Sequence, residues 1–340
     1  MTSATTPDRG PVLPGLALAL AVGLAARGLH GLLPASVGRA VGEVVLAVGL
    51  GLAAGNLLPL PGATRAGIHF AQGTLLRLAI VLLGATFSLA AALAIGVRSL
   101  LMVAALMTLA LAAATLLGRL LAVPSNLASL IAVGTAVCGN SAISAVAPVI
   151  GARDEETAYA IATNTLFGTA AVFAYPALGQ LLGLGDAAYG TWAGTAVNDT
   201  SQVVAAGFAF SAAAGQVATV VKLTRNALMG PVLVLMGLLH ARRSPGRGAL
   251  TRSVPPFVLG FLALALLHSL GLLGPVPEYA PAAARFLILV ALAGVGLATR
   301  LAAMRRIGWR PFGLGLAVAV LTSLASLLWI RWLGPAASGG

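Results

Sequence analysis

Charged residues are unusually scarce in this sequence. Charged residues make up 8% of its 340 positions, whereas about 25% is usual for a soluble chain. Hydrophobic residues make up 59%, and the mean hydropathy is +1.00. Because no soluble fold could cover so much apolar surface, we expect the lipid bilayer to be the solvent for most of the chain.

The residues of common catalytic and metal sites are also scarce. Cys138 is the only cysteine, which excludes an intrachain disulfide. The four histidines lie near the ends of predicted spans and show no metal-ligand spacing. The sequence contains neither a nucleophile elbow of the form G-x-S-x-G nor a nucleotide-binding Walker motif. We therefore predict that the protein is not an enzyme and needs no cofactor or metal other than a coupling ion, H⁺ or Na⁺.

Long apolar segments are what the sequence does contain. They predict an all-α polytopic integral membrane protein with about eleven transmembrane helices. Residues 13–334 are predicted to form a single transmembrane transporter domain between two tails, 1–12 and 335–340. The predicted spans run roughly over 13–34, 40–59, 68–95, 99–121, 126–150, 157–182, 191–211, 215–240, 254–273, 282–303 and 311–334.

The net charge of +12 comes from arginines that cluster in short loops. Two clusters lie at 242–252 and 300–310, which is the positive-inside pattern that orients membrane proteins. Placing both clusters in the cytoplasm puts the N-terminus inside and the acidic turn 154–156 outside. No basic surface with interleaved aromatic residues is evident, so nucleic-acid binding is not expected.

A short polar signature occurs twice within the apolar segments. Residues 134–137 read Gly-Thr-Ala-Val before Cys-Gly-Asn-Ser, and residues 194–197 read the same before Asn-Asp-Thr-Ser. Polar residues and glycines at membrane depth cost free energy unless they line a cavity or bind a ligand. The signature segments, 131–150 and 191–211, are therefore predicted to be discontinuous helices near the midplane, as in secondary transporters. Helix packing through small residues is the alternative.

A second internal similarity indicates inverted repeats. Residues 77–98 resemble residues 285–306: both begin with arginine, contain small residues in the middle and end at a basic turn. They belong to the third and tenth predicted spans, which cross in opposite directions, as inverted repeats do. The two signature copies lie in parallel spans, however. A re-entrant segment, a span count that is off by one, and local convergence all remain open.

Asp199 is the acidic residue that lies deepest in the apolar sequence. Of the eight acidic residues, only Glu43 and Asp199 lie within apolar segments. A carboxylate at that depth must pair with a base, bind a cation or be protonated. We predict a coupling site for a proton or a sodium ion, with a structural ion pair as the alternative. On a continuous helix, Thr195, Asp199 and Gln202 would share one face.

Lys222 and Arg225 lie one turn apart on one face of the following span. Three roles are open to them. They could compensate the charge of Asp199, supply positive charge for an anionic substrate, or extend to the membrane interface, as long basic side chains readily do.

The candidate substrate- and ion-binding residues are polar residues or glycines of the two signature segments, together with these two bases. They are Thr135, Cys138, Gly139, Asn140, Ser141, Asn198, Asp199, Thr200, Ser201, Gln202, Lys222 and Arg225. In the first segment, Thr135, Cys138 and Ser141 are expected to lie close together on one side. A small anion is expected between the two segments, where helix N-termini and their N–H groups would face it.

Several motifs between residues 75 and 310 are specific in combination. They are Gly134–Ala145, the acidic turn Asp154–Glu156, Thr165–Thr169, Tyr175-Pro176, Trp192–Val203 and Val221–Arg225. In these motifs the chain resembles the sulfate exporter family of bacterial membrane proteins (YeiH-like). The resemblance implies export of sulfate or a sulfonate across the bacterial cytoplasmic (inner) membrane. The family's His-Asp pair reads Asn198-Asp199 here, which puts proton handling at position 198 in question.

This family is distantly similar to the superfamily of sodium–bile acid symporters and sodium–proton antiporters. There, two discontinuous helices cross near the midplane, and a core domain moves against a scaffold domain. The expected function is thus secondary active transport of a small anion by alternating access, coupled to protons or sodium. A sodium-coupled carrier of organic anions or amino acids and a passive anion channel are the alternatives. The lipid bilayer and, by analogy, a second copy of the chain are the expected partners.

Overall fold

The computed structural model describes residues 11–33, 42–86, 89–239, 256–300 and 308–336. Every regular element among these residues is helical, and none of them forms a strand, which confirms the all-α prediction. Six of the described helices are long and apolar enough to span a membrane. The chain divides into two compact units. Unit 1 consists of Met1–Ser88 and Gly260–Leu301, and unit 2 consists of Leu89–Leu259 and Ala302–Gly340.

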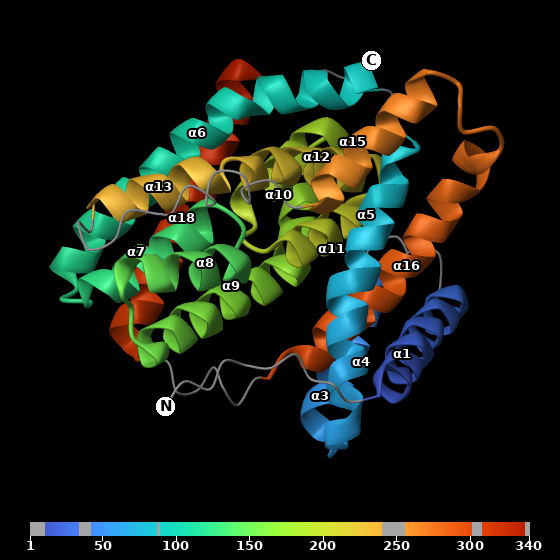
Figure 1. Cartoon of the computed structure of the whole chain (residues 1–340), viewed down its shortest axis with the longest axis horizontal. Helices are drawn as coiled ribbons and strands as arrows, with labels where there is room; N and C mark the ends of the chain where they lie inside the picture. The colour runs from blue at the N-terminus through green and yellow to red at the C-terminus, as the bar shows by residue number, and fades with distance from the viewer. Residues whose placement is uncertain (1–10, 34–41, 87–88, 240–255, 301–307, 337–340) are drawn as a thin grey trace. The chain divides into compact units, whose positions relative to one another are not determined.

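Unit 1 is built around the long helix α16. Its elements are α1 (Val12–Leu32), α3 (Glu43–Leu57), η1 (Gly62–Thr64), α4 (Arg65–Phe70), η2 (Ala71–Leu75), α5 (Leu76–Gly84) and α16 (Val276–Ala298), while α15 (Pro256–Ser269) runs across the boundary between the units. Figure 1 shows α16 in orange beside α1, α3 and α5 in blue. The segment from η1 to α5 is continuous and contains one turn of π-helix, η2.

Small residues allow α3 and α16 to approach closely. Gly51 and Gly55 lie directly against the backbone of α16, at Ala293 and Leu297. Membrane helices commonly associate through such small-residue faces, because lipid offers no hydrophobic driving force for packing. Beyond this contact, the Asn56 side chain donates a 2.8 Å hydrogen bond to the carbonyl that follows α16, at Thr299.

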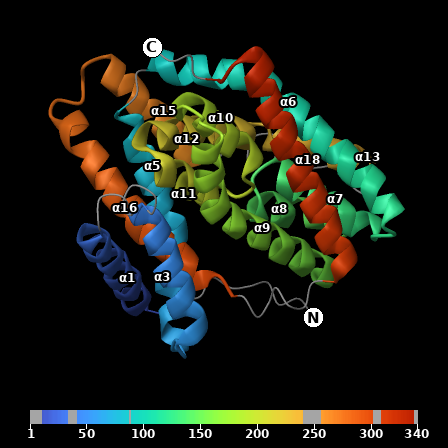
Figure 2. The same cartoon turned by 180° about the vertical axis from the view of Figure 1, so that it is seen from behind.

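Unit 2 contains the two signature segments. Its helices are α6 (Leu89–Leu120), α7 (Ser125–Ala136), α8 (Asn140–Ile150), α9 (Asp154–Leu181), α10 (Asp186–Ala196), α11 (Thr200–Phe210), α12 (Ala212–Ala227), α13 (Met229–Leu239) and α18 (Trp309–Leu333). Helix α12 packs against α6, α10 and α11, and α7 packs against α6 and α9. Seen from behind in Figure 2, α18 in red runs next to α6 and also packs on α7, α9 and α10.

Aromatic side chains fix α10 within this unit. Trp192 stacks on Tyr175 of α9, with ring centroids 4.2 Å apart, and its Nε1 donates a 3.1 Å hydrogen bond to Ser323 of α18. Tyr189 stacks on Phe210, and its hydroxyl donates to the Ala206 carbonyl at 3.0 Å. Because buried aromatic residues supply large contact areas and their polar atoms need partners, these contacts hold the helix that ends at the second signature.

Several predicted spans differ from the helices observed. The third and fourth predictions, 68–95 and 99–121, are wrong at their shared boundary. Helix α5 ends at Gly84, and α6 already begins at Leu89 and continues through Arg98. The prediction 215–240 is likewise divided, because α12 ends at Ala227 and α13 begins at Met229.

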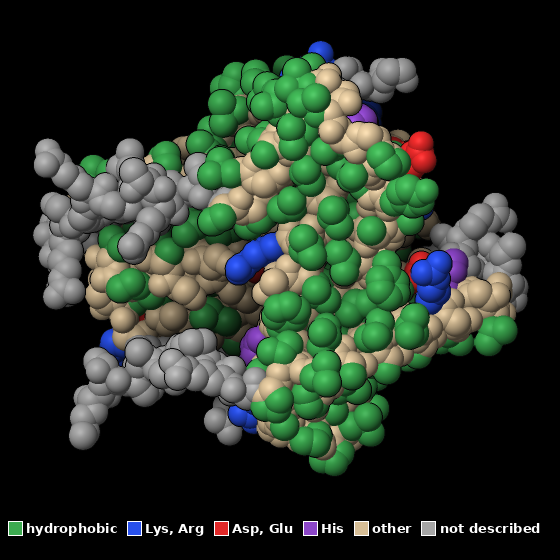
Figure 3. Space-filling view, turned by 45° about the vertical axis from the view of Figure 1, so that its right-hand side comes forward, with side chains coloured by type: hydrophobic (Ala, Val, Ile, Leu, Met, Phe, Trp, Pro, Cys, Tyr) green, Lys and Arg blue, Asp and Glu red, His purple; other side chains and the backbone are tan. Residues whose placement is uncertain are grey.

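The surface of the described residues is strongly apolar. Hydrophobic side chains dominate the face shown in Figure 3, and charged side chains are few on it. Large apolar residues are widely exposed, such as Leu101 at 74%, Leu181 at 86% and Trp332 at 80%. Exposed apolar area of this extent is what a surrounding bilayer would cover.

Some of the sequence predictions fall outside the described residues. The arginine cluster 242–252 does so entirely, and the cluster 300–310 does so for residues 301–307. The predicted orientation in the membrane therefore stays a prediction. The same holds for the inverted repeat, because the second copy, 285–306, extends beyond residue 300, where the described range ends.

Candidate functional site

Both signature segments consist of a helix that ends, a short non-helical stretch and a second helix. Helix α7 ends at Ala136 and α8 begins at Asn140, while α10 ends at Ala196 and α11 begins at Thr200. We call the intervening stretches, 137–139 and 197–199, the first and second breaks. In each copy, Gly-Thr-Ala closes the helix and Val opens the break.

The two breaks touch each other at Gly139 and Asp199. Gly139 has φ +67° and ψ −130°, a conformation that residues with a side chain rarely adopt. A Cβ at this position would lie 3.0 Å from the Asp199 Oδ2 atom and 2.9 Å from the Asn164 Nδ2 atom. Glycine is therefore required both for the backbone turn and for the close approach of the second break.

Lys222, the only lysine of the chain, connects the two breaks. Its side chain is completely buried on α12. The ammonium donates to the Val137 carbonyl of the first break at 2.9 Å and to the Val197 carbonyl of the second at 3.3 Å. It also donates to the Asn198 carbonyl. One side chain thus binds the backbone of both breaks.

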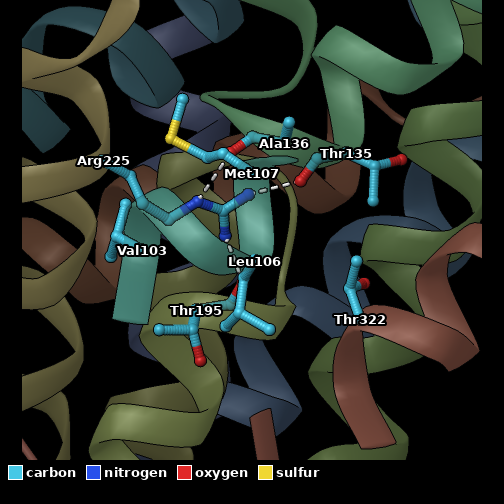
Figure 4. Close-up of a pocket in the computed structure, with 8 residues that line it drawn as sticks. All are labelled: Val103, Leu106, Met107, Thr135, Ala136, Thr195, Arg225 and Thr322. Carbon is cyan, nitrogen blue, oxygen red and sulfur yellow. Dashed lines mark hydrogen bonds between the residues drawn. The ribbon is translucent and has the colours of Figure 1, made fainter. Parts of the chain in front are cut away.

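Arg225 binds the backbone of the last turns of α7 and α10, and this residue is only 2% exposed. Its Nε donates to the Ala136 carbonyl at 3.1 Å, and its Nη2 donates to the Thr135 carbonyl. Its Nη1 donates to Thr195 at 2.6 Å and to Val197 at 3.1 Å. In Figure 4 the guanidinium lies between the ends of the two helices.

These contacts bear on the roles considered for the two bases. The last carbonyls of a helix lack partners within the helix and form the negative end of its dipole. Lys222 and Arg225 supply donors and positive charge at two such ends. Extension to the membrane interface is wrong, because both side chains are buried. Among the described residues, neither base forms an ion pair with Asp199.

Asp199 is the last residue of the second break and precedes the first residue of α11. Its Oδ1 accepts hydrogen bonds from the Ser201 backbone N–H at 2.9 Å and from the Ser201 hydroxyl at 2.7 Å, so Asp199 is the N-cap of α11. The prediction that Thr195, Asp199 and Gln202 share one helical face is wrong. Thr195 lies on α10, and the second break separates that helix from the one that Asp199 begins.

Polar residues of α9 form hydrogen bonds with the first turns of α8 and α11. Asn164 donates to the Asn140 side chain at 2.9 Å, and Asn140 donates to the Thr165 hydroxyl at 3.1 Å. Gln202 donates to the Thr165 carbonyl at 3.3 Å. The candidate set omitted Asn164 and Thr165, although two adjacent polar residues inside the apolar segment 157–182 could have indicated them.

The remaining candidates occupy different surroundings. Cys138 is buried in the first break with its Sγ 3.6 Å from the Met229 sulfur, whereas Ser141 is exposed. The predicted grouping of Thr135, Cys138 and Ser141 on one side of a helix is therefore wrong, because the break separates α7 from α8. The Thr200 hydroxyl accepts a 3.2 Å hydrogen bond from Asn226 of α12.

A small pocket lies beside the helix ends that Arg225 caps. Three threonines and the guanidinium provide its polar lining, and side chains of α6 provide most of the apolar part (Figure 4). It has room for about one water molecule. The lining residues are Val103, Leu106, Met107, Thr135, Ala136, Thr195, Arg225 and Thr322.

Comparison with known proteins places this chain in a family of membrane proteins. The family described as conserved hypothetical protein 698 matches residues 14–315. The chain belongs to this family. It is 38% identical to UPF0324 membrane protein Atu0671 of Agrobacterium fabrum over 301 residues, which cover 88% of this chain and 86% of that protein.

Other relatives agree with this assignment. A UPF0324 membrane protein of Clostridium tetani is 33% identical over 87% of this chain and 91% of its own length. UPF0324 membrane protein BH02290 of Bartonella henselae is 35% identical over 94% of this chain and 92% of its own length. No solved structure matches the chain. The apolar helices and these relatives together show that the chain is a multi-pass membrane protein.

Proposed function

We propose that this membrane protein is a secondary transporter of a small anion and that the substrate binds next to the two breaks of unit 2. The charge of the cluster is the main support. Lys222 and Arg225 contribute two positive charges and Asp199 one negative charge, while two helix C-termini and two helix N-termini roughly cancel. The residual positive charge at a buried position favours an anionic ligand.

The helix N-termini are where the anion would bind. Helices α8 and α11 begin at Asn140 and Thr200, and the first turn of α8 has no side-chain cap. Backbone N–H groups at such ends bind oxyanions readily. Asn140, Ser141, Thr200, Ser201 and Gln202 would add hydrogen bonds, and Lys222 and Arg225 would contribute positive potential while holding the helix ends.

Asp199 would couple the gradient to anion movement. An ionised carboxylate beside the N-terminus of α8 competes with an anionic substrate for the same positive pole, and binding of a proton or cation removes that competition. The start of α11 is partly exposed, which is consistent with access from that side. A break that can rearrange then provides the alternating exposure that transport requires.

The wider architecture follows from the same proposal. Residues 126–150 and 191–211 would each cross the membrane as one interrupted span, giving about eleven spans in inverted repeats. The protein would lie in the bacterial inner membrane with its N-terminus in the cytoplasm, as a homodimer, with no enzymatic activity and no cofactor beyond the coupling ion. Sulfate or a sulfonate is the first substrate to test, because of the sequence resemblance; organic anions follow.

Flux measurement in proteoliposomes tests this function. Labelled sulfate uptake is measured under imposed pH and sodium gradients, for the wild type and for Asp199→Asn. Asparagine caps helices as well as aspartate does, so this variant should fold while losing the titratable, cation-binding charge. A coupled carrier is supported if the wild type shows saturable, gradient-driven flux and Asp199→Asn does not. Large, non-saturating conductance that the variant retains would instead identify a passive channel.

A further inference from the structure

Polar residues occupy an exposed side of the span that runs from η1 through η2 to α5 in unit 1. This span, Gly62–Gly84, is long and apolar enough to cross a membrane. Three of its exposed residues are nevertheless polar: His69, Thr74 and Arg77. Ionisable side chains within membrane spans almost always face water or protein, because contact with lipid tails costs free energy. This side of the span is therefore poorly suited to face lipid.

The π-helical turn η2 directs these residues outward. The buried positions of the span include Ile68, Ala71, Leu76, Ala79 and Leu83. They recur every three or four residues except between Ala71 and Leu76, where η2 lies. A π-turn inserts an extra residue into a helix. The apolar residues before and after η2 thus stay buried, against α16 among other elements, while polar residues project from the opposite side.

Arg77 has a free guanidinium group on this side. Among the residues that the structure describes, it forms no hydrogen bond and no ion pair. The Thr74 hydroxyl, one turn earlier, has no hydrogen-bond partner among them either. Gly73 also lies one turn before Arg77, and a Cβ at Gly73 would meet no atom within 4 Å. Two free donor groups therefore border an open surface.

Extension to the membrane surface does not explain Arg77. The residue lies about two turns before the end of the span at Gly84. Side chains on a helix lean toward its N-terminus. The Arg77 side chain therefore leans toward the middle of the span, whereas an arginine that anchors a helix to the lipid headgroups extends toward the nearer surface.

The chemistry of this surface favours an oxyanion. The planar guanidinium group presents paired N–H donors that match two oxygens of a sulfate, a sulfonate or a carboxylate. The threonine hydroxyl can donate one more hydrogen bond. The span Gly62–Gly84 contains no Asp or Glu, so no carboxylate on the same element competes for Arg77. A metal cation would be repelled by the guanidinium charge.

We propose that this side of η2 and α5 lines a water-filled path in the membrane, and that Arg77 binds an oxyanion there with the help of the Thr74 hydroxyl. These residues belong to unit 1, whereas the two breaks belong to unit 2. The inference rests on the proposed function only in identifying the oxyanion as the transported substrate. Water access and anion binding can both be measured without transport.

Cysteine reactivity tests both parts of the proposal, because the only cysteine of the chain, Cys138, is buried. Leu78 is 47% exposed next to Arg77, and Leu78→Cys leaves Arg77, Thr74 and Gly73 in place. The full-length protein is reconstituted in phosphatidylcholine vesicles with sulfonatoethyl methanethiosulfonate on both sides. This charged reagent forms a disulfide with a thiolate and releases methanesulfinate, and mass spectrometry follows the modification.

Leu316→Cys is the matched control for water access. Leu316 is 43% exposed and lies about two turns after the start of α18. Its exposed neighbours one turn away, Phe312 and Val320, are apolar, as expected of a side that faces lipid. We expect Leu78→Cys to react roughly tenfold or more faster than Leu316→Cys, because a thiol ionises and meets the charged reagent only in water.

Sulfate, titrated against chloride at constant ionic strength, tests the anion site. It should slow the reaction of Leu78→Cys saturably. In this background, Arg77→Gln should raise the sulfate concentration needed for protection about tenfold or more. Arg65→Gln is the matched control, because Arg65 is exposed at the start of α4 in the same span, and should keep the protection. Each variant's rates with and without sulfate are compared as a ratio, since Arg77 also promotes ionisation of a nearby thiol.

Several outcomes would overturn the inference. Equal rates for Leu78→Cys and Leu316→Cys, in proteins that unfold like the wild type, would place this side of the span against lipid. Rapid modification without saturable protection, or protection that Arg77→Gln retains in full, would remove the anion site. Protection that requires phosphatidylglycerol in the vesicles would assign Arg77 to lipid headgroups. Because none of these measurements uses flux, each outcome would leave the proposed transport function to its own assay.

Discussion

Replacing Lys222 with methionine tests whether this lysine holds the two breaks together. Methionine has nearly the same length and no donor. The substitution removes a donor from three buried carbonyls; Val197 keeps its hydrogen bond from Arg225, so those of Val137 and Asn198 lose the donor that Lys222 supplied without such a replacement. If Lys222 binds the backbone of both breaks, the loss should appear in the stability of the folded protein even when no substrate is present.

The magnitude follows from the acceptors that lose their donor. A buried carbonyl without a donor costs about 1–3 kcal/mol, so the two of Val137 and Asn198 cost about 2–6 kcal/mol together. Removing a buried ammonium recovers several kcal/mol of desolvation, which offsets part of this cost. We therefore expect Lys222→Met to lower the free energy of unfolding by about 2–4 kcal/mol, the part of that cost which the recovered desolvation does not offset.

Unfolding by sodium dodecyl sulfate in mixed micelles, followed by tryptophan fluorescence, measures this change. Arg119→Met is the matched control, because Arg119 is exposed in the last turn of α6 of the same unit. It should cost only about 0.3–1 kcal/mol. Equal stability of the two variants would refute the reasoning, and a raised KM in an equally stable Lys222→Met protein would make Lys222 a substrate ligand.

Three further predictions concern the same site. Gly139→Ala should destabilise the protein by at least about 1 kcal/mol more than Gly151→Ala, because both glycines have positive φ but only Gly139 is crowded, by Asn164 and Asp199. Detergent unfolding measures this difference in stability, and equal destabilisation by the two variants would mean that the breaks do not touch. Lys222 should resist amine-reactive reagents in the folded protein and react after denaturation, as mass spectrometry can show, since it is fully buried; rapid modification of folded protein would contradict that burial. Asp199→Asn should stay within about 1 kcal/mol of wild-type stability, because asparagine is an equivalent N-cap; a collapse in thermal unfolding would assign the carboxylate a structural role.

The sequence was most informative about the elements whose physical signal is local. The scarcity of charge predicted a helical membrane protein, and the helix predicted at 157–182 is observed as α9, Asp154–Leu181. Boundaries were predicted poorly where apolar residues continue across them. The gap between Gly84 and Leu89 lies between two leucine-rich stretches, and Arg98 resembled a span end although α6 continues through it.

The roles of the site residues were less accessible from the sequence. Repetition of Gly-Thr-Ala-Val indicated which segments to consider, but not that their carbonyls converge on α12. Lys222 and Arg225 form contacts with residues 24 to 90 positions away, and nothing local in the sequence specifies such partners. Asn164 was missed for the same reason, because its significance comes from its position beside Gly139 and Asp199.

Counterflow in proteoliposomes tests most directly whether the breaks form the substrate site of a carrier. Vesicles are loaded with unlabelled sulfate or, in parallel, with a small organic anion, and are diluted into a trace of the same labelled compound. A carrier with one alternately exposed site should accumulate the label transiently above its equilibrium level, and crowding at the breaks in Gly139→Ala should abolish the accumulation. Label that only equilibrates, for every anion and for wild type and variant alike, would contradict the account.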